Sequence, residues 1–130
     1  MTQMRVIARG FEQGAGVHWA VEEVAGRKKE DGNFSADILD LRTLLPFDKE
    51  AIENTVKKTG KVIVLHEDCM TGGIGGEISA WISENCFADL DAPVIRVASL
   101  DSPVPFSIPL ENNFLAKTRL SGKMKELLEY

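Results

Sequence analysis

The sequence predicts an α/β fold in which helices cover a mostly parallel sheet. Three observations lead to this prediction. Short apolar runs alternate with longer amphipathic segments along the chain, which is the pattern of strands joined by crossover helices. The run at residues 61–66 is nearly all aliphatic, as expected of a strand buried on both faces. No internal repeat or low-complexity tract interrupts the 130 residues, so we expect one domain over residues 1–130.

The first half of the chain predicts two strands and two helices. Residues 4–9 form a short apolar run ended by Gly10, which indicates a strand. A helix is expected to open at Gly14, because apolar residues then recur at helical spacing: Val17, Ala20, Val21 and Val24. Residues 36–41 form the second strand. The second helix is expected between Asp48, a suitable N-cap, and Gly60, a suitable C-terminal stop.

The second half predicts two more strands and two more helices. After the strand at residues 61–66, the glycine-rich turn at residues 71–76 leads into a helix with one apolar face, formed by Ile74, Ile78, Trp81 and Ile82. Residues 93–97 form the fourth strand. Three prolines then break regular structure: Pro103, Pro105 and Pro109. A short helix over residues 123–130 closes the chain.

Composition excludes several classes of function. Fifteen Lys and Arg against twenty Asp and Glu give a net charge of -5 and an isoelectric point of about 5.0, which argues against nucleic acid as the main partner and leaves a basic protein partner open. We find neither a membrane span nor a signal peptide in the sequence. The two cysteines form no disulfide framework, so we expect a cytoplasmic location.

The strongest local signal for a site is the sequence from His66 to Gly76, at the carboxyl edge of the predicted sheet, where open α/β folds bind ligands. A glycine-rich helix entry can bind an anion through its backbone N–H groups. Alternatively, the glycines only allow a tight turn and close helix packing. The pattern matches neither nucleotide fingerprint, since Ile78 stands where the G-x-G-x-x-G motif needs glycine and no P-loop Lys follows.

His66 has a chemical and a structural interpretation. With Glu67 and Asp68 beside it, His66 has the residue types of a general base and an orienting carboxylate. The structural interpretation is that His66 caps a strand end and bonds to the neighbouring loop. The chain has neither the spacing of a structural zinc site nor a G-x-S-x-G nucleophile elbow. We therefore assign no catalytic, cofactor-binding or metal-ligating residues, and expect no self-sufficient active site.

Three blocks carry a resemblance to a known family. They are residues 36–48 (ADILDLRTLLPFD), the His66-Glu67 pair with its Thr-Gly-Gly turn, and residues 90–97 (LDAPVIRV). In order and spacing they resemble the carboxyl-terminal domain of the beta subunit of thiamine-diphosphate-dependent 2-oxoacid dehydrogenases, a domain with the transketolase C-terminal fold. Further sequence details look closer to the branched-chain (2-oxoisovalerate) type than to the pyruvate type: His66-Glu67-Asp68, Ala80-Trp81-Ile82 and Pro105-Phe106.

The resemblance implies a three-layer α/β/α sandwich on a five-stranded mixed sheet with one antiparallel edge strand. It runs from about Gly14 to Tyr130. The match is weakest over residues 1–13, because the family's first strand ends in Thr-Tyr-Gly where this chain has IARGFEQ at residues 7–13. In the family, thiamine diphosphate and Mg lie between other domains of the complete enzyme. The resemblance therefore implies an oxidoreductase with a disulfide acceptor, of which the isolated domain is inactive and binds neither thiamine diphosphate nor Mg.

The resemblance also implies the function of the domain and its partners. Family members use this domain for dimer contacts with the rest of the decarboxylating component and for docking the lipoyl acyltransferase core. Candidates for lining an interface or the mouth of the cofactor cleft are His66, Glu67, Gly72, Gly73 and Gly75. Candidates for docking are Asp91, Glu126, Glu129 and the carboxylate of Tyr130, since the partner presents basic side chains. The alternative is a free-standing α/β module that binds an anionic small ligand at the His66 to Gly76 loop.

Overall fold

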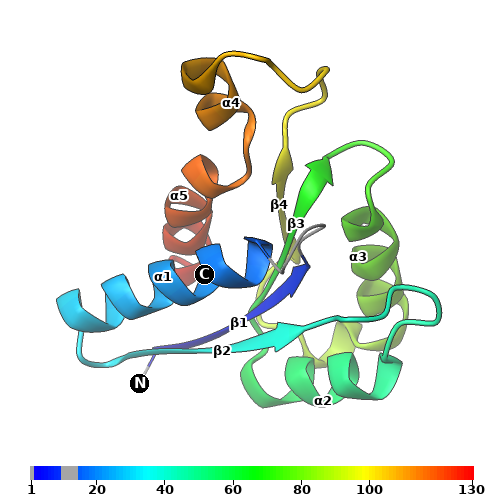
Figure 1. Ribbon diagram of the computed structural model, residues 1–130. Coiled ribbons are helices and arrows are strands. Elements are labelled where there is room, and N and C mark those ends of the chain that lie inside the picture. Colours follow the sequence, from blue (N-terminus) through cyan, green and yellow to red (C-terminus); the bar gives the residue numbers. More distant parts are fainter. Residues whose placement is uncertain (1, 10–14) are drawn as a thin grey trace.

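Strands and helices alternate along the chain in the computed structural model, which describes residues 2–9 and 15–130 (Figure 1). The first four elements are β1 (Thr2–Arg9), α1 (Ala15–Glu30), β2 (Phe34–Asp40) and α2 (Lys49–Thr59). They are followed by β3 (Val62–Cys69), α3 (Ile74–Asn85), the short 3-10 helix η1 (Phe87–Asp89) and β4 (Ile95–Ser99). Two further helices end the chain, α4 (Ile108–Phe114) and α5 (Lys117–Leu128). The predicted ends of the first strand and start of the first helix, Gly10 and Gly14, lie outside the described residues.

The strands form one sheet with the order β2-β1-β3-β4, and each neighbouring pair is parallel. The predicted α/β class with its mostly parallel sheet is confirmed. The antiparallel fifth strand implied by the resemblance is not among the strands of residues 2–9 and 15–130. The chain moves in one direction from β1 to β2 and in the opposite direction from β2 to β3 and from β3 to β4, so right-handed crossovers place α1 on one face of the sheet and both α2 and α3 on the other.

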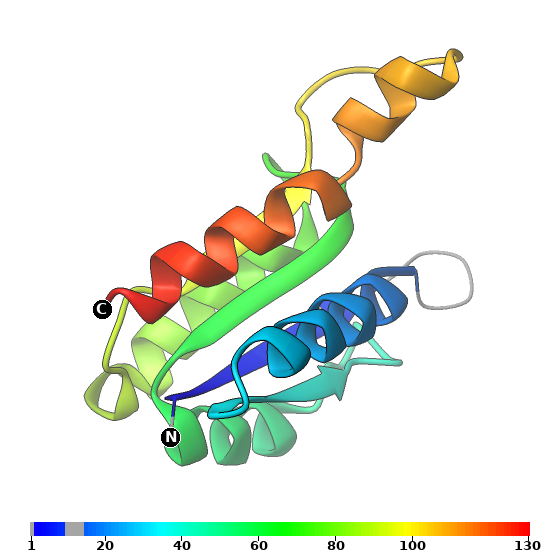
Figure 2. The same cartoon turned by 90° about the vertical axis from the view of Figure 1, so that its left-hand side faces the viewer.

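Two buried clusters fill the space between the sheet and its two helical layers. The strand β3 supplies both, because its side chains alternate: Ile63 and Leu65 face one cluster, whereas Val62 and Val64 face the other. The first cluster contains α1 and α5 residues, among them Ala20, Leu120, Met124 and Leu127. The second contains α2 and α3 residues, among them Ile52, Val56, Ile78 and Ile82. This gives the three-layer sandwich seen in Figures 1 and 2.

Local signals placed the ends of α2 correctly. The Asp48 carboxylate accepts a hydrogen bond from the Ala51 N–H at 2.9 Å, which satisfies one of the unpaired donors of the first turn. At the other end Gly60 has a φ of 65°, the left-handed conformation in which glycine is free of strain, and its N–H donates to the Val56 carbonyl.

Three expectations from the sequence about the helices are wrong. Val21 is 49% exposed, whereas Val17, Ala20 and Val24 pack into the first buried cluster. The closing helix begins at Lys117 instead of residue 123, since Leu120 already belongs to its buried face. Pro109 lies in the first turn of α4, where its missing N–H has no intrahelical partner to lose, so this proline begins a helix.

Within the described part of the chain, every helix is too short or too polar to cross a lipid bilayer.

Candidate functional site

The sheet topology directs attention to one edge. The strand order reverses between β1 and β3, whose following helices α1 and α3 cover opposite faces. In open α/β sheets, ligands bind at the carboxyl ends of strands at such a reversal. The loop after β1 contains residues 10–14, which lie outside the described residues. The loop after β3 contains the glycine-rich turn, so the predicted site residues of this turn do lie at the expected edge.

His66 does not cap a strand end. It lies inside β3, where it pairs in register with Arg9, and its side chain is only 2% exposed. The strand continues through Glu67 and Asp68 to Cys69, which pairs with Ser99 after an irregularity in the register. The predicted charged loop is therefore mostly strand, because pairing with β1 and β4 extends it beyond the aliphatic run.

Two glycines make room for the buried imidazole. A Cβ atom at Gly75 would lie 2.5 Å from Cδ2 of His66, and a Cβ atom at Gly73 would lie 2.5 Å from its Cε1. Real carbon atoms do not approach so closely. The first turn of α3 thus lies directly against the His66 ring, which supports the interpretation of these glycines as packing residues. Gly72 has a φ of 77° and serves the turn itself.

The environment of His66 favours an uncharged ring. Burial lowers its pKa below the ordinary value of 6.5, and the nearby Arg96 guanidinium lowers this pKa further, while the Asp68 carboxylate opposes both effects. Neither ring nitrogen has a hydrogen-bond partner within the described residues. Among the described residues, neither a proton donor nor an orienting carboxylate is hydrogen-bonded to this ring, as a general base would require.

The entry of α3 leaves little space for an anion beside His66. Its N-cap, Gly73, offers no side-chain hydrogen bond, and the Gly76 N–H already donates to the Gly73 carbonyl at 3.1 Å. The imidazole fills the space that Gly73 and Gly75 leave open on the side of the sheet. The anionic-ligand interpretation therefore gains no support from this arrangement.

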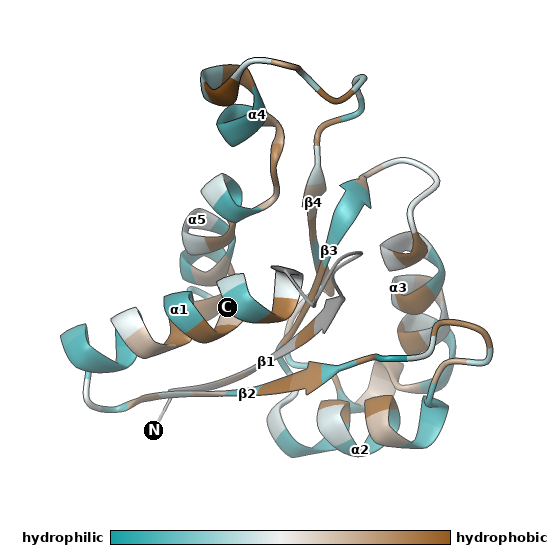
Figure 3. Cartoon of the chain, viewed as in Figure 1, coloured by the Kyte–Doolittle hydropathy of each residue, from teal (hydrophilic) through white to brown (hydrophobic). Residues whose placement is uncertain are grey.

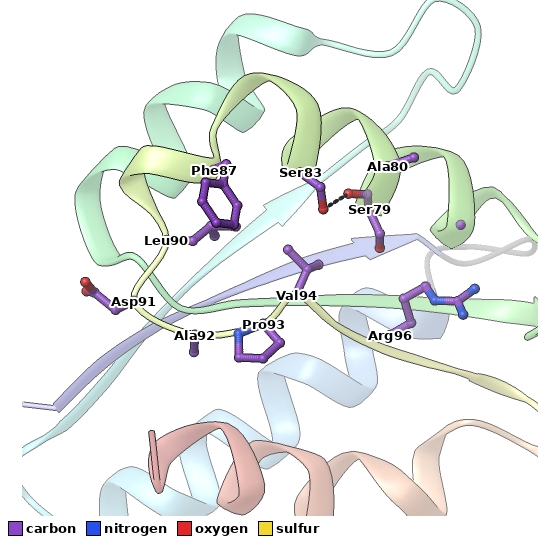
Figure 4. Close-up of a pocket in the computed structure, with 11 residues that line it drawn as sticks. Ser79, Ala80, Ser83, Phe87, Leu90, Asp91, Ala92, Pro93, Val94 and Arg96 are labelled. Atoms are coloured by element: carbon purple, nitrogen blue, oxygen red, sulfur yellow. Dashed lines mark hydrogen bonds between the residues drawn. The ribbon is translucent and has the colours of Figure 1, made fainter.

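A groove that the sequence did not predict runs between α3 and the edge strand β4 (Figure 4). Its volume is about 790 Å³, and its lining includes Ser79, Ser83, Phe87, Asp91, Val94 and Arg96. Figure 4 shows these side chains coming from α3 on one side and from the chain leading into β4 on the other. The Ser79 hydroxyl is buried without a hydrogen-bond partner among the described residues. Sequence reasoning missed the groove because its two walls come together only when α3 packs against β4, and no local sequence pattern indicates that contact.

Asp91 stands at one end of this groove. Its N–H donates to the Gly60 carbonyl at 2.8 Å, and its side chain lies over Gly60, where a Cβ atom would come within 2.7 Å of the carboxyl carbon. The neighbouring Ala92 belongs to the same buried cluster as Leu127 of α5. Asp91 therefore follows η1 near the last turns of α5, and Figure 2 shows the C-terminus at that end of the molecule.

The remaining docking candidates differ in how available they are. Glu129 and Tyr130 are exposed at the end of α5. Glu126 is paired with Lys123 at 2.6 Å, which neutralises part of the acidic field expected there. Glu67 is half-buried, and its backbone carbonyl accepts a hydrogen bond from the Ser99 hydroxyl at 2.5 Å. Among the described residues, no three His, Cys, Asp or Glu side chains converge to hold a metal ion.

Comparison with known families identifies the family of this chain. The model of the family described as transketolase, C-terminal domain, matches residues 13–119. The chain belongs to this family.

Curated relatives of this transketolase C-terminal domain are beta subunits of 2-oxoacid dehydrogenases. A 2-oxoisovalerate dehydrogenase subunit beta of Bacillus subtilis is 43% identical over 116 residues, which is 88% of this chain and 35% of that protein. The mitochondrial 2-oxoisovalerate dehydrogenase subunit beta 2 of Arabidopsis thaliana is 42% identical over 111 residues, 82% of this chain and 31% of that protein. A mitochondrial pyruvate dehydrogenase E1 component subunit beta of Dictyostelium discoideum is 42% identical over 85 residues, 65% of this chain and 24% of that protein.

A solved structure shows the same fold. It is described as a split gene transketolase, inactive beta4 tetramer, and matches 99% of this transketolase C-terminal domain and 39% of that chain, with a TM-score of 0.76 and 22% sequence identity. The resemblance to the beta subunit of the branched-chain dehydrogenases is confirmed. The chain spans about a third of the length of the curated branched-chain relatives described above.

Proposed function

We propose that this domain serves subunit association and acyltransferase docking in the decarboxylating component of a 2-oxoacid dehydrogenase of the branched-chain, 2-oxoisovalerate type. The identity of 42–43% to beta subunits of that type, over most of this chain, carries the proposal. The site agrees with it, since His66 is buried and neither nitrogen of its ring has a hydrogen-bond partner among the described residues. The complete enzyme would be an oxidoreductase with a disulfide acceptor.

Thiamine diphosphate and Mg would be cofactors of the complete enzyme and would be held by its other domains. The described residues do not fit either group, because they contain no cluster of metal-ligating side chains and the glycine entry beside His66 is filled by the imidazole ring. The two free cysteines, Cys69 and Cys86, agree with the cytoplasmic location that we propose.

The docking surface that we propose is the end of the molecule with Asp91 and the C-terminus. Asp91 and Glu129 are exposed carboxylates that Lys123, which pairs with Glu126, does not neutralise in this structure. A subunit-binding domain with basic side chains would be attracted to such a field. Each exposed charge is screened by salt, so the surface sets association rate and specificity more than stability.

The experiment removes charge at this end and measures docking. In the complete enzyme, deletion of Glu129 and Tyr130 is expected to weaken binding to the acyltransferase about tenfold, with a shallower salt dependence, because the Glu129 carboxylate is lost. Glu50→Gln is the matched control. Glu50 is an exposed acid in the first turn of α2, at the opposite edge of the sheet. Titration by surface plasmon resonance provides the measurement. Equal affinity of the truncated and control enzymes would show that the C-terminus is not a docking determinant.

A further inference from the structure

The groove between α3 and β4 has the size of a small-molecule site. Its volume is about 790 Å³. Sites for small molecules usually measure about 300–1,000 Å³. Hydrophobic and hydrophilic stretches alternate along α3 (Figure 3), but the residues of this helix that line the groove are all small. They are Gly76, Ser79, Ala80 and Ser83. Because no long side chain of α3 fills the space, the groove stays open to a ligand.

Arg96 of β4 places a positive charge at one end of the groove, and Asp91 lies at the other end (Figure 4). Arg96 is the one Lys or Arg among the described residues that line the groove. One terminal nitrogen of this half-buried side chain donates to the Met70 carbonyl at 3.3 Å. The ion pairs between described residues do not include Arg96. A guanidinium carries five N–H donors in a plane that matches a carboxylate, so Arg96 has donors left for an anion.

The carboxylate of Asp101, which lies close enough to respond to the Arg96 charge, is held by other donors. It accepts hydrogen bonds from the Thr71 N–H at 2.8 Å and from the Thr71 hydroxyl at 2.6 Å. The pKa of the Asp101 carboxyl lies below its ordinary value, chiefly because the Thr71 hydroxyl donates to it, and Arg96 has a smaller effect. His66, the other titratable group that responds to Arg96, is buried and favours its uncharged form. The Arg96 charge is therefore not cancelled by an ion pair, and a singly charged anion would complement it.

The Ser79 hydroxyl lies near the same end of the groove. A Cβ atom at Gly76, one turn earlier in α3, would lie 3.5 Å from Nη1 of Arg96. Figure 4 shows the Ser79 side chain pointing from α3 toward the strand, between Val94 and Arg96. Its hydroxyl is buried and has no hydrogen-bond partner among the described residues. A serine side chain turns about a single bond, so this hydroxyl can donate to a ligand without loss of an internal hydrogen bond.

The rest of the groove is mainly apolar. Its further lining residues include Phe87, Leu90, Ala92, Pro93 and Val94. A hydrocarbon chain is favoured along such a wall, because contact removes both apolar surfaces from water. Asp91 at the far end carries a negative charge, which would repel a second anionic group there. The groove therefore fits a molecule with one anionic end and an apolar remainder.

We propose that the groove between α3 and β4 binds a small monocarboxylate with an apolar chain. The carboxylate accepts hydrogen bonds from the Arg96 guanidinium and the Ser79 hydroxyl, and the chain lies along Val94 toward Phe87. This binding site is separate from the proposed docking surface at the C-terminus and does not rest on the proposed function of the domain.

Titration with sodium octanoate tests the proposal. The isotopically labelled 130-residue chain is followed by nuclear magnetic resonance at neutral pH, below the concentration at which octanoate forms micelles. We expect saturable shifts of the amide signals of Ser79, Val94 and Arg96, and no shifts in α5. Two probes of equal chain length are the controls: octylamine, which has an ammonium group, and octanedioate, which has a carboxylate at each end. Each should bind about tenfold more weakly than octanoate. Equal affinity for octanoate and octylamine, or shifts confined to other surfaces, would overturn the proposal.

Variants of the two polar groups assign their roles. Arg96→Met should weaken octanoate binding about tenfold, whereas Lys125→Met, the same change of charge at an exposed position of α5, should leave it unchanged. Ser79→Ala should also weaken binding about tenfold, and because it removes no internal hydrogen bond, it decides the question even if Arg96→Met does not fold. Its control is Ser83→Ala, since the Ser83 hydroxyl already donates to the Ser79 carbonyl at 2.8 Å. Octanoate affinity that is equal in Ser79→Ala and Ser83→Ala would refute the proposed contacts.

The same titration separates this proposal from the docking proposal. Deletion of Glu129 and Tyr130 should leave octanoate binding unchanged, because both residues lie outside the groove. Loss of octanoate binding in this truncated chain, with its fold intact, would contradict the separate site.

Discussion

Replacement of Gly75 by Ala tests the packing of α3 against the buried histidine. An added Cβ atom would lie 2.5 Å from Cδ2 of His66 and would also meet its Nε2 atom. The ring cannot move away easily, since its side chain is 2% exposed and lies inside the central strand β3. The substitution therefore forces the helix, the ring or both to shift.

The expected cost follows from two opposing effects. Overpacking of a filled core costs about 1–3 kcal/mol, whereas Ala in place of Gly in a helix gains about 1 kcal/mol. We expect Gly75→Ala to lower the free energy of unfolding by up to about 2 kcal/mol, which is a decrease in Tm of up to roughly 8 °C for a domain of this size.

Removal of the ring should reverse the sign of the effect. With His66→Ala in the background, the nearest remaining atom to the new Cβ at Gly75 is Cγ1 of Val64 at 3.6 Å, which is an ordinary van der Waals contact. Gly75→Ala should then stabilise the His66→Ala variant by up to about 1 kcal/mol, through helix propensity alone. The coupling energy between the two positions should be about 1–3 kcal/mol.

Two neighbouring glycines provide controls. A Cβ atom at Gly73 would collide with the backbone carbonyl of Cys69 as well as with His66, so Gly73→Ala should remain destabilising without the ring. At Gly76 the nearest atom is Nη1 of Arg96 at 3.5 Å, so Gly76→Ala should be tolerated in both backgrounds. Urea unfolding followed by circular dichroism measures all variants. If Gly75→Ala costs the same with and without the His66 ring, the packing argument is wrong.

Three further predictions concern the pH dependence of stability, the contacts of Arg119 with α4, and the cofactor. The free energy of unfolding should fall as the pH drops through about 6.5, because burial lowers the pKa of His66 in the folded state and the unfolded chain takes up the proton first; one group contributes at most about 1.4 kcal/mol per pH unit. His66→Asn should remove this part of the slope, and an unchanged slope in urea titrations would contradict the assignment. Arg119→Met removes hydrogen bonds to three carbonyl groups. It should destabilise the domain by about 2–4 kcal/mol and increase the rate of amide hydrogen exchange in α4. The control variant Lys117→Met should have neither effect. Calorimetry of the isolated domain with thiamine diphosphate and Mg should give no saturable heat, and micromolar binding would refute the proposed division of labour.

Features set by neighbouring residues were predictable from the sequence. Asp48 and Gly60 bound α2 because a cap needs only the residues beside it. The aliphatic run at residues 61–66 identified the central strand for a similar reason. The apolar spacing in α3 also indicated its buried face, which holds Ile78 and Ile82.

Features that depend on distant contacts were not predictable in the same way. The sequence contains no signal that β3 continues through His66 to Cys69, because that extension follows from pairing with β1 and β4. The close approach of Gly75 to His66 likewise appears only when α3 folds back against the sheet. The groove beside β4 likewise forms only when α3 packs against the sheet, because its lining residues come from both elements.

The central position of β1 has a consequence for how the chain reaches its folded state. β1 pairs in parallel with β2 and also with β3, whose partner residues lie far along the chain: Arg5 pairs with Val62, and Arg9 pairs with His66. Parallel strands cannot be joined by a tight hairpin, so a long loop must close, at a cost in entropy, before the strands of each pair can form their hydrogen bonds. The high contact order of this topology predicts slow folding relative to a helical bundle of equal length. During synthesis on the ribosome, the sheet cannot be completed until β4 has been synthesised. One edge of β1 remains unpaired until β3 has been synthesised.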